Sequence, residues 1–329
     1  IPRPAAPRRE TAWPEIAAYT RRARESWQRW HDDPGPTPFG DVCGSGFEHV
    51  VLVALGEAAA FLGEDGGPGL ELVIETDLPV GRGFGSSAAT AAGTVAAYLG
   101  LRGAVVTRAE LQRLAVEVER RQHGLPSGVD PATVLHGGVL WAERDAAGEL
   151  VVSPIAGASL LLSRLAVFDT GQPPEPTGEV VGRVRELQRR DPATAAAAWN
   201  AIEAATRALR DLLVDPAAPP RAALPLLRRS ERALEALGVV PEPVRRVVRE
   251  IEAAGGAAKV SGAGSLAGPG AGCLLALHED PARLAGIARP GIAPRGLAPA
   301  GAGRPGAELG VERLAVGLGG PGLAVEAGP

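Results

Sequence analysis

Apolar positions spaced three and four residues apart run through most of the chain, and this periodicity predicts many helices. The first two are expected at 13–30, with aromatic anchors, and at 49–62, where nearly all residues are apolar. Thr107 and Glu110 form the T-x-x-E pattern of a capping box, which predicts the start of another helix. The other expected helices cover 86–99, 107–123, 177–190, 194–213, 222–237 and 241–254.

Alternation of apolar and charged residues predicts the strands. Aliphatic residues at positions 70, 72 and 74 alternate with glutamates, which is the pattern of a half-buried strand over 70–77. A glycine-rich loop over 79–85 follows and leads directly into the helix expected at 86–99. Asp130 and Pro131 predict the N-cap and the first residue of a short helix. Further strands are expected at 137–142, 160–168 and 311–316, and at the two ends of the segment 259–277.

The length allows two domains. The chain has 329 residues, of which 45% are hydrophobic, so a sizeable core is expected. We expect the division near residue 155, giving domains 1–155 and 156–329, with a Gly- and Pro-rich tail from about residue 290. The net charge of −4 and the lack of a long basic block argue against nucleic-acid binding, and no apolar run predicts a membrane span.

Three residue types add to this picture. The chain contains no Met and begins with Ile1, which suggests that the natural protein begins further upstream. Cys43 and Cys273 are far apart and match no metal-binding spacing, which is typical of reduced thiols in a cytoplasmic protein. Lys259 is the single lysine, so arginine supplies the other 33 of the 34 basic side chains.

The loop before the helix at 86–99 is the first candidate site. It reads G-R-G-F-G-S-S-A over 81–88. Glycines allow the backbone to approach a ligand closely, and a helix N-terminus points free N–H groups at an anion, so this segment is a candidate phosphate site. The alternative is a structural turn with a serine N-cap. The spacing fits neither a Walker A loop nor a dinucleotide-binding fingerprint.

Two acidic residues and a second glycine loop complete the candidates. Glu119 follows Leu111 and Ala115 at steps of four, which places it on the apolar face of its helix. Such a carboxylate either binds a metal or is a helix-edge residue paired with an arginine. Asp130 follows a Pro- and Gly-rich loop and is either a general base or a plain N-cap. The loop over 259–268 is either a ligand loop or a hairpin turn.

Together these segments resemble the GHMP kinases, small-molecule kinases acting on galactose, homoserine, mevalonate and phosphomevalonate. The run E-R-R-Q-H-G-L-P-S-G-V-D over 119–130 is similar to the G/E-R-x-x-H-G-x-P-S-G-[VI]-D run of the mevalonate kinase branch. The loop at 79–88 resembles P-x-x-x-G-x-G-S-S-A, with Phe84 where Leu is usual. Residues 259–264 resemble K-[LIV]-[ST]-G-A-G, but continue as S-L-A-G-P rather than as a glycine run.

The resemblance implies a two-domain α+β GHMP kinase fold with the active site in the interdomain cleft. It implies that ATP, with Mg²⁺, phosphorylates the 5-hydroxyl of (R)-mevalonate. Asp130 matches the catalytic aspartate, and Ser87 and Glu119 match the magnesium ligands. The residues that match the ATP-phosphate loop are Gly81, Arg82, Gly83, Phe84, Gly85, Ser86 and Ser87. Thr177, Gly262 and Ala263 match positions near the substrate.

One family motif has no counterpart in this chain. GHMP kinases begin with a strand and a P/F-G-K-x-x-L-x-G-E-H motif, whereas no lysine precedes Lys259 here. We therefore expect the first strands and the lysine motif of domain 1–155 to be absent from this sequence. Two alternatives stay open: another GHMP kinase, acting on phosphomevalonate or a sugar, and an inactive fragment that binds nucleotide. The expected partner is a small molecule, and a homodimer is compatible with the resemblance.

Overall fold

The computed structural model describes residues 9–33, 46–156, 158–289 and 310–326. Within these ranges the chain packs as two compact units. The first unit is built from the described parts of 1–75, 87–126 and 324–329, and the second from those of 76–86 and 127–323. Both units therefore contain segments that are distant in sequence. The domain boundary that the sequence predicts near residue 155 stays a prediction.

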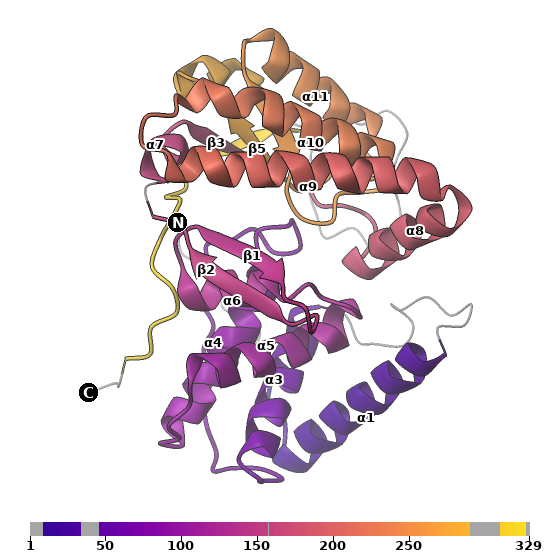
Figure 1. Ribbon diagram of the computed structural model, residues 1–329. Helices are drawn as coiled ribbons and strands as arrows, with labels where there is room; N and C mark the ends of the chain where they lie inside the picture. The colour runs from indigo at the N-terminus through magenta and orange to yellow at the C-terminus, as the bar shows by residue number, and fades with distance from the viewer. Residues whose placement is uncertain (1–8, 34–45, 157, 290–309, 327–329) are drawn as a thin grey trace. The chain divides into compact units, whose positions relative to one another are not determined.

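The first unit is helical. Its helices are α1 (Trp13–Asp32), α3 (Phe47–Phe61), α4 (Ser86–Leu101, from Ser87 onward) and α5 (Arg108–His123). Helix α3 is apolar on nearly all sides, so its middle is buried in a core shared with α1, α4 and α5 (Figure 1). The Thr107–Glu110 capping box is present at the start of α5, and Gly124 ends that helix, as predicted.

The expected strand over 70–77 is not formed. No strand among the described residues pairs with this segment, and strand structure requires a hydrogen-bonded neighbour. Leu70 and Leu72 are instead partly buried against the helical core of the first unit, whereas Val73 is 71% exposed. The alternation in the sequence therefore reports one-sided burial and not pairing.

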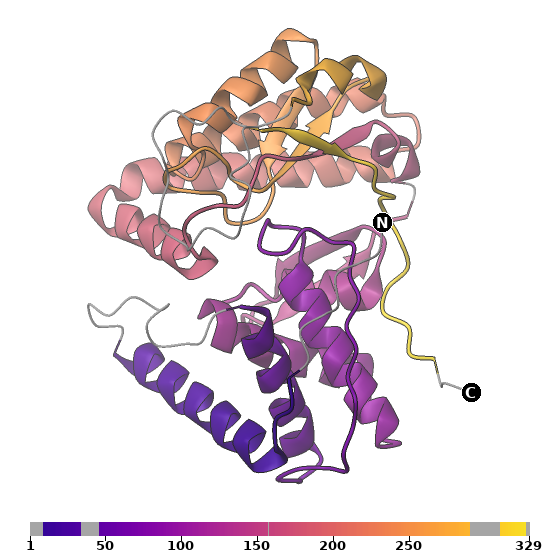
Figure 2. The ribbon, with the colours of Figure 1, turned by 180° about the vertical axis from the view of Figure 1, so that it is seen from behind.

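The second unit contains a four-stranded antiparallel sheet in the order β4-β5-β3-β6. The strands are β4 (Ala257–Val260), β5 (Cys273–Leu277), β3 (Leu165–Asp169) and β6 (Glu312–Leu314). Helices α9 (Pro192–Val214), α10 (Leu224–Ala236) and α11 (Glu242–Ala253) cover one face of this sheet. Figure 2, from behind, shows the strands on the other side. Phe168, Leu274, Val247 and Ile251 are fully buried between the layers.

The second unit contains several further elements. Helix α6 (Val129–His136) precedes the hairpin of β1 (Leu140–Arg144) and β2 (Leu150–Pro154), and α8 (Thr177–Arg190) precedes α9. Short turns of helix lie at α7 (Ser159–Leu162), η1 (Pro220–Ala223) and η2 (Pro281–Ile287). The strand expected at 160–168 is thus replaced by α7 followed by β3, and β2 was not predicted.

The expected role of Asp130 as an N-cap is wrong. Helix α6 begins two residues earlier than predicted, with Gly128 at the N-cap in a left-handed conformation (φ +82°). The Val129 amide donates to the Ser127 hydroxyl over 3.2 Å, which helps to turn the chain into the helix. Asp130 is therefore the second residue of α6, where its side chain does not cap the helix.

Two expectations lie partly outside the described residues. The Gly- and Pro-rich tail includes 290–309 and 327–329, which are not described, while 310–326 contain β6. Cys43 also falls outside the described ranges. Among the helices that are described, none combines the length and apolar character needed to cross a bilayer.

Candidate nucleotide site

The loop at 81–86 has the backbone geometry of an anion site. Gly81, Gly83 and Gly85 all have positive φ (+72°, +76° and +73°), whereas Arg82 and Phe84 between them do not. Positive φ at alternate residues is a feature of backbone nests, in which successive N–H groups face a bound anion. Helix α4 begins at Ser86, so its positive dipole end adds to the attraction. The predicted phosphate loop therefore has a structure that suits a phosphate.

The second glycine loop lies directly behind the first. A Cβ on Gly83 would meet the Ser261 carbonyl oxygen at 2.9 Å, and a Cβ on Gly262 would meet the Gly83 Cα at 3.2 Å. The Cys273 amide at the start of β5 donates to the Arg82 carbonyl over 2.9 Å. The two loops, separated by about 180 residues in the sequence, are thus in backbone contact within the second unit.

Arg82 is held in place by a buried carboxylate. Its guanidinium forms an ion pair with Asp169 Oδ2 at the end of β3, and Asp169 Oδ1 accepts the Gly171 amide over 2.8 Å. Asp169 is 3% exposed, whereas the Arg82 side chain is 38% exposed. One side of the guanidinium is therefore fixed while its other donors stay accessible beside the loop. No local pattern in the sequence marks Asp169, because its partner Arg82 is 87 residues away.

The second glycine loop is anchored by buried charged groups at its start. The Val260 amide donates to Glu231 Oε2 on α10 over 2.9 Å, and the Lys259 ammonium donates to the Val260 carbonyl over 2.7 Å. Burial raises the pKa of Glu231 to about 7, and burial lowers the pKa of Lys259 although Glu231 opposes that shift. Burial also raises the pKa of Cys273 to about 11, so this thiol is protonated and unreactive at neutral pH.

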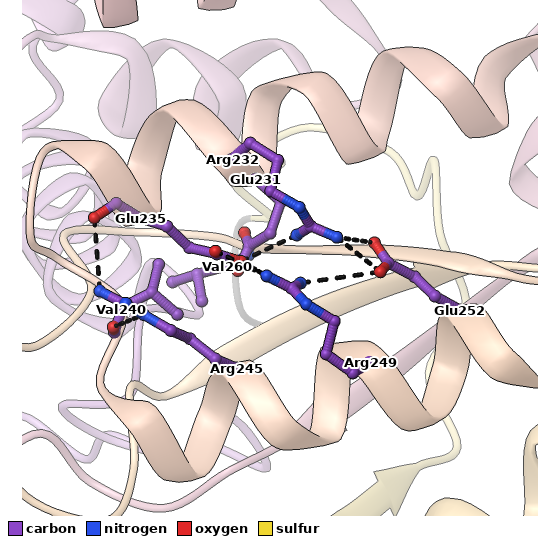
Figure 3. A network of polar contacts seen from close by, with 8 residues as sticks. All are labelled: Glu231, Arg232, Glu235, Val240, Arg245, Arg249, Glu252 and Val260. Carbon is purple, nitrogen blue, oxygen red and sulfur yellow. Dashed lines mark hydrogen bonds and ion pairs between the residues drawn. The ribbon is translucent and has the colours of Figure 1, made fainter.

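An ion-pair network surrounds Glu231 (Figure 3). Arg232 on α10 contacts both oxygens of Glu252 on α11 over 2.6 and 2.5 Å, and Arg249 contacts Glu235 over 2.7 Å. Arg245 donates to the Val240 carbonyl over 2.7 Å. These contacts fasten α10 to α11 behind β4 and so fix the helix that carries Glu231.

The predicted substrate residues all belong to the second unit. Gly262 is exposed, and Ala263 is half-buried against the core of that unit. Thr177 is exposed at the first residue of α8, two residues after Glu175, which contacts the second glycine loop. The structure therefore places Gly262 against Gly83 of the phosphate loop, and Glu175 links the start of α8 to the second glycine loop.

The two predicted magnesium ligands belong to the first unit. Ser87 Oγ is buried and has no hydrogen-bond partner among the described residues. Glu119 is 4% exposed, and its Oε1 lies 3.7 Å from His123 Nε2. Burial lowers the pKa of His123 to about 4, so the imidazole is neutral at neutral pH. A buried hydroxyl without a partner and a buried carboxylate are oxygen donors that suit Mg²⁺.

Asp130 is exposed on α6, and enough protein surrounds its carboxyl group that desolvation raises its pKa. A raised pKa makes a carboxylate a stronger proton acceptor, which suits a general base. No group of three or more His, Cys, Asp or Glu among the described residues forms a metal cluster. Mg²⁺ at phosphoryl-transfer sites is usually bound by one or two carboxylates together with phosphate oxygens and water.

Known proteins are similar to this chain in sequence. The family described as GHMP kinases N terminal domain matches residues 51–138. A mevalonate kinase of Archaeoglobus fulgidus is 30% identical over 213 residues, which cover 64% of this chain and 66% of that protein. A mevalonate kinase of Pyrococcus furiosus is 28% identical over 219 residues, which cover 65% of this chain and 61% of that protein. The chain thus spans less than two thirds of these relatives.

The fold comparison agrees. The structure of L. major mevalonate kinase in complex with R-mevalonate superposes with a TM-score of 0.55 at 20% identity. The superposition covers 72% of this chain and 70% of that chain. The α+β fold expected from the sequence is thereby confirmed. Residues 51–138 thus match the GHMP kinases N terminal domain, and over about two thirds of its length the chain is similar to curated mevalonate kinases.

Proposed function

We propose that this chain is part of a small-molecule kinase that transfers the γ-phosphoryl group of ATP to the 5-hydroxyl of (R)-mevalonate. The observation that supports the proposal most strongly is the loop 81–86, whose three positive-φ glycines and following helix form a cradle for phosphate. The curated relatives named mevalonate kinase support the substrate. A cytoplasmic location, a homodimer and a site in the interdomain cleft remain expectations from the resemblance.

In this proposal, named residues of the chain bind the phosphates, accept the proton and hold Mg²⁺. The backbone N–H groups of 81–86 would bind the polyphosphate, and the Arg82 guanidinium would neutralise phosphate charge while Asp169 holds it. Asp130 would accept the proton of the attacking hydroxyl. Ser87 and Glu119 would hold Mg²⁺, which when bound supplies charge neutralisation at the phosphates. Thr177, Gly262 and Ala263 are proposed to line the substrate side.

The Asp130→Asn variant tests the assignment of the base. An amide cannot take the proton, so we expect phosphorylation of mevalonate to fall by at least about 100-fold. The circular dichroism spectrum and the thermal midpoint should stay unchanged. Asp211→Asn is the matched control, because Asp211 is exposed on α9 and pairs with its neighbour Arg210. Undiminished turnover by Asp130→Asn would show that the base is another residue.

A substrate panel distinguishes the proposal from its alternatives. The wild-type chain is given ATP with (R)-mevalonate, phosphomevalonate, galactose or homoserine, and the release of ADP is measured. Turnover with mevalonate alone supports the proposal, and turnover with phosphomevalonate or galactose assigns another GHMP substrate. ATP binding by calorimetry without turnover on any of them identifies a nucleotide-binding fragment.

A further inference from the structure

The second glycine loop departs from a pure glycine run at 265–267, and this stretch has its own anchor. Glu175, in the segment between β3 and α8, points its carboxylate at the loop. Glu175 Oε1 accepts the Ala267 amide over 2.9 Å, and Oε2 accepts the Ser265 hydroxyl over 2.8 Å. The Leu266 amide lies 3.4 Å from Oε2. One carboxylate therefore meets donors from three consecutive loop residues.

The Ser265 end of this contact is buried, whereas Ala267 is exposed. Ser265 is completely buried, and its amide donates to the Val239 carbonyl over 2.9 Å. Leu266 packs against the core of the second unit. Because buried polar groups cost free energy unless they are paired, the Glu175 carboxylate stabilises a conformation that the loop would otherwise adopt less often.

The loop that Glu175 holds also supports the phosphate loop. Ser261 and Gly262 lie against Gly83, as the short distances to a Cβ at either glycine show. On the other side of the loop, Gly268 lies against Pro174, next to Glu175, so the segment 174–175 follows the loop over several residues. Movement at 265–267 would therefore be transmitted through Gly264 and Gly262 to the backbone that carries the anion-binding amides.

We propose that Glu175 is a positioning residue for nucleotide binding, whose carboxylate fixes residues 265–267 and thereby holds Gly262 against Gly83. The proposal rests on the proposed role of the loop 81–86 in binding ATP. Within the part of the chain that the structure describes, the hydrogen bonds of Glu175 go to residues 265–267, so its effect acts through the second glycine loop.

The test compares Glu175→Ala with Glu179→Ala in the full chain. Glu179 is a matched control, because it is exposed in the first turn of α8 and carries the same charge four residues away. Two quantities are measured: hydrogen exchange of the 262–268 amides without nucleotide, and the Kd for Mg-ADP by calorimetry. In Glu175→Ala we expect exchange at Leu266 and Ala267 about tenfold faster and a Kd about tenfold weaker. Glu179→Ala should change neither by more than about twofold.

A second variant keeps the test decisive if Glu175→Ala folds poorly. Glu175→Gln retains one acceptor oxygen and loses the other, so an intermediate change in exchange and in Kd is expected. Unchanged hydrogen exchange of the 266–267 amides in both variants would show that Glu175 does not fix residues 265–267. Faster exchange with an unchanged Kd would overturn its role in nucleotide binding. If the wild-type chain failed to phosphorylate mevalonate, the proposed function would be contradicted. The hydrogen-exchange measurement would still show whether Glu175 fixes residues 265–267.

Discussion

At the scale of single residues, Gly83 is constrained twice. Its φ of +76° disfavours a side chain, and a Cβ would meet the Ser261 carbonyl at 2.9 Å. Gly85 has a similar φ of +73° but nothing within 4 Å of a Cβ. We expect Gly85→Ala to lower the free energy of unfolding by about 1–2 kcal/mol and Gly83→Ala by roughly twice as much. Urea unfolding measures both, and equal losses would show that the contact between the glycine loops is unimportant.

Glu231 makes stability depend on pH in a defined direction. Burial raises its pKa from 4.5 to about 7, so the folded state keeps a proton that the unfolded state releases. The free energy of unfolding should therefore fall, by up to about 3 kcal/mol, as the pH rises from 4.5 to 7. Glu231→Gln stays neutral and keeps an acceptor for the Val260 amide.

The variant isolates this contribution by difference. Urea unfolding at several pH values should show Glu231→Gln gaining stability over wild type between pH 4.5 and 7, with no further gain above pH 7.5. His123, whose lowered pKa of about 4 acts in the opposite direction, is present in both proteins and cancels. A difference that is constant with pH would mean that Glu231 is ionised in the folded protein.

The sequence identified the residues that belong to motifs but not the residues that hold them. Glycines 81, 83 and 85 were predicted because their spacing and the following serines form a local pattern. Asp169, Glu175 and Glu231 were missed, since each acts on a segment that is 29 to 92 residues away. Tertiary packing selects such partners, and no periodicity records it.

At the scale of elements, the contact of α1 with α3 depends on Gly56. A Cβ at this position would lie 2.0 Å from Thr20 Oγ1, and the Thr20 hydroxyl donates to the Leu52 carbonyl over 3.3 Å. We expect Gly56→Ala to lower the free energy of unfolding by about 2–3 kcal/mol, because the helices must separate. Gly93→Ala in α4 meets nothing within 4 Å and should raise it by about 0.5–1 kcal/mol.

Denaturation of the two variants and of Thr20→Ala/Gly56→Ala checks this reasoning. The double variant should recover part of the loss, since it removes the hydroxyl and methyl groups that a Cβ at position 56 meets. Gly56→Ala as stable as Gly93→Ala would contradict the close approach of α1 and α3.

Helices were predicted better than strands for a physical reason. The start of α8 at Thr177 and the start of α5 follow from local signals such as caps and periodicity. A strand exists only when a distant segment pairs with it, so alternation at 70–77 gave a false strand. Strand β2 was not predicted for the same reason, because it is a strand through its pairing with β1.

At the scale of the whole molecule, the phosphate loop and the helix that follows it belong to different compact units. Residues 76–86 pack with the second unit, and α4 from Ser87 onward packs with the first. The backing of the phosphate loop by 261–273 and by Asp169 lies entirely within the second unit. A nucleotide that binds the backbone of the phosphate loop should therefore stabilise the packing of residues 261–273 and Asp169 against this loop more than the helices of the first unit.

Hydrogen exchange with and without Mg-ADP tests this expectation. At about 100 times its Kd, a ligand stabilises the structure that binds it by about 2.7 kcal/mol. We expect the largest slowing of exchange at 81–86 and 261–268, and little at α1, which carries none of the proposed ligand groups. ADP without Mg²⁺ should give weaker protection if Ser87 and Glu119 hold the ion. Binding seen by calorimetry with protection confined to α1 and α3 would place the nucleotide elsewhere and reject the loop 81–86 as its site.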